Sequence, residues 1–68
     1  MKHYVSSFKV GVGGMAVAGP FDTRAEADSW VTNLTIDQRN LFPCLQLTMG
    51  PDDLGPEWAS NLNKFINV

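Results

Sequence analysis

The first stretch with alternating apolar positions predicts a β-strand over residues 4–12. Apart from Ser6, apolar side chains recur there at every second position, which places them on one face of a strand. We expect this face to point to the core, and its members are Tyr4, Ser6, Phe8, Val10 and Val12. Glycines at 11, 13 and 14 predict a hairpin turn, because glycine adopts positive φ angles without steric cost. A second strand over residues 15–21 completes an antiparallel hairpin.

The next stretch, residues 23–34, has the pattern of an amphipathic helix. Thr23 precedes Glu26 by three residues, the spacing of a capping box in which each side chain bonds the other's backbone N–H. An apolar stripe follows at helical spacing, made of Ala27, Trp30, Val31 and Leu34. A second capping box, Thr35 with Gln38, predicts a short helical turn through residue 40.

The last third of the chain predicts a strand over residues 42–49 and a second amphipathic helix. Gly50-Pro51 forms a turn signal, Gly55-Pro56 breaks the chain again, and Pro56 suits the first turn of a helix. The apolar stripe of this final segment consists of Leu54, Trp58, Leu62, Phe65 and Ile66.

These elements predict a single α+β domain that spans residues 1–68, in the order β-β-α-β-α. A helical crossover joins the second and third strands, so those two strands run parallel to each other. If the third strand lies beside the first, the result is a small three-stranded antiparallel sheet with the order 2-1-3. A right-handed crossover then places the helices on one face of the sheet.

Charge and composition argue against several classes of protein. The net charge is −2, and no two of the five basic residues are adjacent, which disfavours nucleic-acid binding. No apolar run is long enough to cross a bilayer, and the N-terminus lacks the features of a signal peptide. A single cysteine excludes an intrachain disulfide. We therefore expect a cytoplasmic protein with no membrane partner.

The candidates for chemistry are few. Residues 11–16 fit a loose dinucleotide-binding pattern, but the apolar run that follows is too short for the helix that must hold the pyrophosphate. His3 and Cys44 are the lone histidine and cysteine, so we expect no metal site and no cofactor. A small enzyme that uses Cys44 as nucleophile and His3 as base is an alternative, and it requires the two side chains to lie within hydrogen-bond distance.

The densest charged group is acidic and lies before the final helix. Asp52, Asp53 and Glu57 can stabilise the helix dipole, hold a divalent cation weakly, or form an acidic patch for a basic partner. Tryptophan and tyrosine are frequent anchors of protein interfaces, and a sheet this small can hardly bury both Trp30 and Trp58. The predicted partner-binding residues are Tyr4, Asp52, Asp53, Glu57 and Trp58.

Residues 17–28, which contain Gly19-Pro20-Phe21 and Ala25-Glu26-Ala27, resemble one half-repeat of the SPOR family. The resemblance extends to Leu34 and covers about a quarter of the chain. It implies a module that binds peptidoglycan glycan strands. The chain departs from the family because a hairpin precedes this segment, where a SPOR half-repeat has strand, helix and strand.

The leading hypothesis is a non-enzymatic protein-binding module. Free-standing acidic proteins of this size are often phage or mobile-element products, so we expect a small inhibitor or adaptor that masks a surface of a larger host protein by stoichiometric contact. A homodimer formed through a sheet edge or an uncovered face fits the same pattern. Glycan binding and the small enzyme remain the alternatives.

Overall fold

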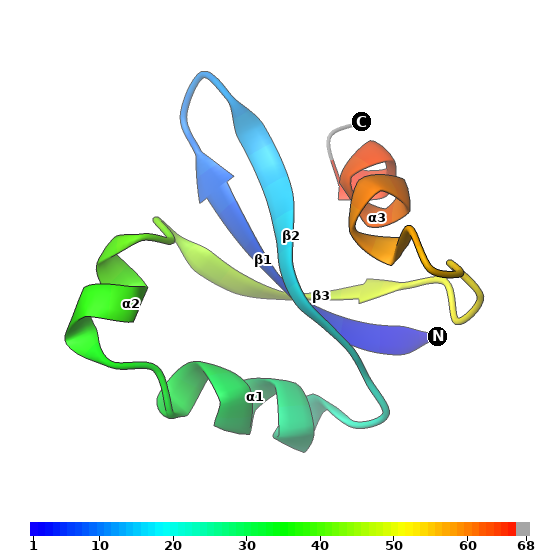
Figure 1. The fold of residues 1–68 in the computed structure, drawn as a ribbon, viewed down its shortest axis with the longest axis horizontal. Helices are drawn as coiled ribbons and strands as arrows, with labels where there is room; N and C mark the ends of the chain where they lie inside the picture. Colours follow the sequence, from blue (N-terminus) through cyan, green and yellow to red (C-terminus); the bar gives the residue numbers. More distant parts are fainter. Residues whose placement is uncertain (67–68) are drawn as a thin grey trace.

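The computed structural model describes residues 1–66 and contains the predicted elements in the predicted order (Figure 1). The fold class is confirmed as α+β, with a short additional helix, α2, at the second capping box. The elements are β1 (Lys2–Lys9), β2 (Gly13–Phe21), α1 (Arg24–Thr32), α2 (Ile36–Asn40), β3 (Leu45–Gly50) and α3 (Trp58–Ile66).

The three strands form an antiparallel sheet in the predicted order, β2-β1-β3. β1 is the central strand, and its register with β3 is regular from Lys2 opposite Gly50 to Ser7 opposite Leu45. The register with β2 shifts on both sides of Val5. This irregularity explains why the consecutive residues Val17 and Ala18 both pack in one apolar cluster, although an ideal strand would point them to opposite faces.

The helices lie on opposite faces of the sheet, which corrects the expectation that they share one face. Val5 packs with Ala27 of α1, whereas its neighbour Tyr4 stacks on Trp58 of α3. Successive residues of a strand point to opposite faces, so the sheet lies between α1 and α3. β1 is therefore buried continuously from Tyr4 to Ser7, and alternation alone could not reveal this.

The face toward α1 holds the first apolar cluster. Thr23 begins the helix as its N-cap and accepts the Glu26 N–H at 3.2 Å, as predicted. The reciprocal contact differs, because the Glu26 carboxylate accepts from the Thr23 hydroxyl rather than from its backbone N–H. The cluster consists of Val5, Val17, Ala18, Phe21, Ala27, Trp30, Val31, Leu45 and Leu47.

The opposite face is organised around the ring of Tyr4, which has no exposed surface. The ring stacks on Trp58 with centroids 5.8 Å apart, and the hydroxyl donates to the Pro51 carbonyl at 2.8 Å. Gly19 and Gly50 leave room for it: a Cβ on Gly19 would lie 2.6 Å from Cδ1 of Tyr4, and a Cβ on Gly50 would lie 3.0 Å from Cε2. A side chain at either position would therefore crowd the Tyr4 ring.

Most element boundaries lie a few residues from the predicted ones, and two of these shifts have a clear structural cause. β3 starts at Leu45 rather than at residue 42, because Cys44 adopts a positive φ of 52° and interrupts the extended backbone. β1 ends at Lys9, and residues 10–12 form the turn, which the Val12 N–H closes by donating to the Lys9 carbonyl at 3.0 Å.

Candidate protein-binding surface

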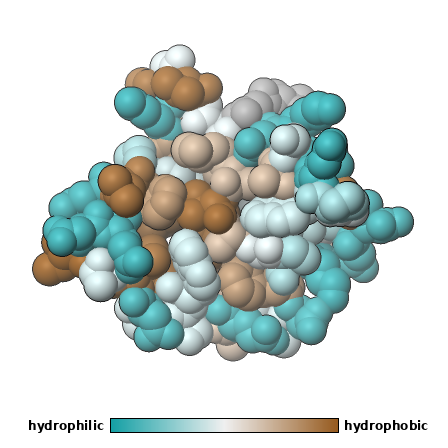
Figure 2. Space-filling model, viewed as in Figure 1, coloured by the Kyte–Doolittle hydropathy of each residue, from teal (hydrophilic) through white to brown (hydrophobic). Residues whose placement is uncertain are grey.

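The end of the β1–β2 hairpin carries several exposed apolar side chains close to its turn. Val10 is 89% exposed and Val12 is 74% exposed, while Phe8 and Met15 on the flanking strands are about half exposed. Figure 2 shows hydrophobic atoms at the projecting end of the molecule that corresponds to this hairpin in Figure 1. We call these four residues the hairpin-end surface. Lys9 is its one charged neighbour between residues 8 and 15.

This placement corrects the expectation that Phe8, Val10 and Val12 point to the core. The helices pack beside the inner part of the hairpin, where Ala16 contacts α3 and Ala18 belongs to the cluster at α1. Beyond these positions the hairpin extends past both helices (Figure 1). The glycines at 11, 13 and 14 indicate this exposure in the sequence, because they place Val10 and Val12 next to the turn, at the tip of a hairpin and far from its packed base.

The structure separates the five predicted contact residues. Tyr4 is fully buried and Trp58 is half-buried against it, so Tyr4 is excluded from the exposed contact surface. Asp52, Asp53 and Glu57 are exposed, as an acidic patch requires. They lie in the segment between β3 and α3, on the other side of the molecule from the hairpin tip (Figure 1). The acidic group and the hairpin-end surface are thus two distinct surfaces.

The acidic group is partly neutralised within the chain. The N-terminal ammonium donates to Oδ1 of Asp52 at 2.8 Å in an exposed ion pair. Hydrogen bonding to this ammonium holds the pKa of Asp52 below its usual value. Asp53 and Glu57 have no such pair among the described residues, which leaves them as the accessible carboxylates of this segment.

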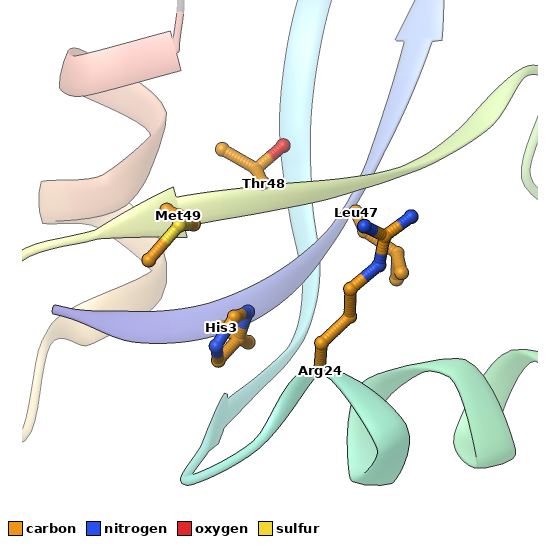
Figure 3. Close-up of a pocket in the computed structure, with 5 residues that line it drawn as sticks. All are labelled: His3, Arg24, Leu47, Thr48 and Met49. Carbon is orange, nitrogen blue, oxygen red and sulfur yellow. The ribbon is translucent and has the colours of Figure 1, made fainter.

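A shallow pocket of about 270 Å³ opens on the α1 side of the sheet, next to β3. In Figure 3 the guanidinium of Arg24 extends from the start of α1 toward Leu47, while His3 and Met49 point to the same side of the sheet. Thr48 points to the opposite side (Figure 3). The pocket brings together a cation, an imidazole and two apolar side chains, and its lining residues include no carboxylate.

His3 and Cys44 do not form a catalytic pair. Cys44 lies just beyond Leu45, which is opposite Ser7, and His3 lies four positions from Ser7 along β1. Four positions of an extended strand span roughly 13 Å. The hydrogen bond that the enzyme alternative requires is therefore absent from this structure.

Neither a metal centre nor a membrane-spanning helix occurs in the described part of the chain. Within residues 1–66, no three histidine, cysteine or acidic side chains gather in a group that could hold a metal ion. No helix in the same range has the length and apolar character needed to cross a bilayer.

Comparisons of the chain with models of known protein families, with curated proteins and with solved structures find no match.

Proposed function

We propose that this chain is a non-enzymatic protein-binding module that acts by stoichiometric contact, as a small inhibitor or adaptor that masks a surface of a larger protein. The observation that carries the proposal is the hairpin-end surface, where Phe8, Val10, Val12 and Met15 expose 45–89% of their surfaces on a projecting hairpin. Apolar side chains gathered on one protrusion favour a site of protein contact, because isolated exposed residues are ordinary but clustered ones are not.

The geometry of the hairpin suits insertion into a groove on the partner. A hairpin end presents side chains on both of its faces, so a concave surface can bury several of them at once. Branched Val10 and Val12 lose little side-chain entropy when they are immobilised, which lowers the cost of binding. Phe8 supplies an aromatic anchor at the base of this surface.

The acidic residues Asp53 and Glu57 are a second, separate contact in this proposal. They favour a basic partner surface and act mainly on the association rate, because exposed charges steer encounter more than they add affinity. A partner that touches both surfaces must be large enough to span the molecule. A cytoplasmic location is part of the same proposal.

The test is an affinity capture from bacterial lysate with matched variants. The tip variant combines Val10→Ser with Val12→Ser and removes the apolar end of the hairpin. The control combines Ile36→Ser with Leu41→Ser, because these two apolar residues lie outside the hairpin and are similarly exposed, 79% and 72%. We expect one stoichiometric protein that the wild type and the control capture and the tip variant loses. Equal capture by all three, or no captured protein, contradicts the proposal.

A further inference from the structure

The two edges of the sheet differ in how they are protected. Along the β2 edge, the side chain of Asn63 on α3 accepts the Ala16 N–H, and Pro20 has no N–H to offer. Proteins commonly protect sheet edges in these ways, since an open edge can pair with another strand.

The β3 edge has none of these protections. Its sequence, Leu-Gln-Leu-Thr-Met-Gly, contains no charge and no proline, and its register with β1 has no bulge. β3 ends the sheet, and among residues 1–66 no further strand pairs with it. Figure 3 looks onto this edge, with β3 in front of β1. The edge is therefore open to another strand.

The direction of the backbone groups on β1 can be read from two contacts. The Phe8 N–H donates to the Pro43 and Cys44 carbonyls, on the side of β3. Hydrogen-bonding direction alternates along a strand, so Ser6 and Tyr4 also direct their backbone groups to β3. The bonding of Ala16 supports this direction. Ala16 of β2 lies opposite Ser6, but its N–H donates to Asn63 rather than to β1.

The same alternation fixes which groups of β3 are free. Gln46 lies opposite Ser6 and Thr48 lies opposite Tyr4, so both direct their backbone groups inward to β1. Leu45, Leu47 and Met49 therefore direct their N–H and C=O groups outward, to the open edge.

From this arrangement we propose that the protein forms a symmetric homodimer in which the β3 edges of two copies pair antiparallel, centred on Leu47. A two-fold axis through Leu47 pairs it with its own copy and pairs Leu45 with Met49 of the second copy. Every outward N–H and C=O of these three residues then finds a partner, about six hydrogen bonds in all.

The side chains are self-complementary in this register. Directly opposite residues point to the same face, so the ladder on the α1 side contains only leucine and methionine. Gln46 meets Thr48 of the second copy on the other face, a polar pair. No charged residue lies on β3, so the paired strands themselves place no like charges opposite each other.

The pocket beside β3 fits the same partner. Leu47 and Met49 line its sheet side, and Met49 is 48% exposed. In the proposed register, Leu45 of the second copy lies against Met49 at the mouth of this pocket. A second copy therefore covers apolar surface that the single chain leaves exposed.

Amide hydrogen exchange tests the register directly. At concentrations up to about 1 mM, where contacts of ordinary weak affinity are populated, we expect the amides of Leu45, Leu47 and Met49 to become at least tenfold slower than in dilute protein. The amides of Gln46 and Thr48 bond β1 and stay protected at every concentration. Exchange at 45, 47 and 49 that stays fast at every concentration overturns the proposal.

A matched pair of variants tests the surface. Met49→Lys places a charge against Leu45 of the second copy, whereas Met15→Lys makes the same change at an equally exposed methionine, 49% against 48%, on the hairpin. Light scattering should give twice the chain mass for the wild type and for Met15→Lys, and a dimer at least tenfold weaker for Met49→Lys. A monomeric wild type, or equal effects of the two variants, overturns the proposal. Loss of partner capture by Met15→Lys alone would bear only on the hairpin-end surface.

Discussion

Replacing Tyr4 by phenylalanine isolates the contribution of a single buried hydroxyl in the core on the α3 side. Tyr4→Phe keeps the ring that stacks on Trp58 and removes the hydroxyl that donates to the Pro51 carbonyl at 2.8 Å. A buried hydrogen bond contributes about 0.5–1.5 kcal/mol. Pro51 lies at the surface, so water can satisfy its carbonyl. We therefore expect a loss of about 1 kcal/mol, or a melting temperature lower by about 4–8 °C in a domain of this size.

The pH dependence of the same variant separates the hydroxyl from general packing effects. Burial, reinforced by the charge of Asp52, raises the pKa of Tyr4. Above the ordinary tyrosine pKa of about 10, the unfolded chain loses this proton before the folded one, so the free energy of unfolding falls as pH rises. Tyr4→Phe has no such ionisation. The difference in the free energy of unfolding between the wild type and Tyr4→Phe must therefore narrow as the pH rises.

Urea unfolding of both proteins between pH 7 and 11 measures these quantities, and absorbance at 295 nm follows the ionisation. Tyr4 is the chain's single tyrosine, so the titration has one source. A variant as stable as the wild type at neutral pH refutes the buried hydrogen bond. A stability gap that stays constant up to pH 11 refutes the raised pKa.

Substitutions at two further positions test the end of β3 and the residue that precedes this strand. Gly50→Ala places a Cβ 2.8 Å from Cδ1 of buried Leu62. Such overpacking should lower the free energy of unfolding, measured in urea, by about 1–3 kcal/mol. Unchanged stability would contradict the close packing of Tyr4 against this strand. Cys44 is a non-glycine residue at φ 52°, so Cys44→Gly removes steric strain and should raise stability by up to about 1 kcal/mol, whereas Cys44→Val should lower stability. A Cys44→Val protein more stable than Cys44→Gly would contradict the left-handed conformation.

The order of elements could be predicted from local patterns, and the layering could not. The capping residues Thr23 and Thr35 mark the starts of α1 and α2, and placing the third strand beside the first gives the strand order 2-1-3 that the structure has. The chain reads Tyr4-Val5-Ser6-Ser7 across the centre of the sheet. A period-two pattern counts serine as a polar, exposed position. In the structure, however, the Ser6 hydroxyl bonds Thr48 at 2.7 Å and the Ser7 hydroxyl bonds the Pro43 carbonyl. These internal bonds allow both faces of β1 to be buried.

The contact surface was harder to predict because burial depends on where the helices end. Val10 and Val12 continue the apolar face of Tyr4, and the pattern alone does not reveal that α3 stops short of them. Tyr4 shows the converse: an aromatic that is typical of interfaces is fully buried because Gly19 and Gly50 make room for its ring. The exposure of Asp52, Asp53 and Glu57 was predictable from charge, since unpaired carboxylates rarely leave water.

Photo-cross-linking from the hairpin tip tests the central claim most directly. A benzophenone side chain at position 10, which is 89% exposed, sits on the hairpin-end surface, and the same group at position 53 sits on the acidic segment. In lysate we predict that irradiation joins the position-10 protein to one partner, and that adding Val12→Ser to this protein reduces the yield. Cross-links from position 53 with none from position 10 would contradict the account and assign the contact to the acidic segment.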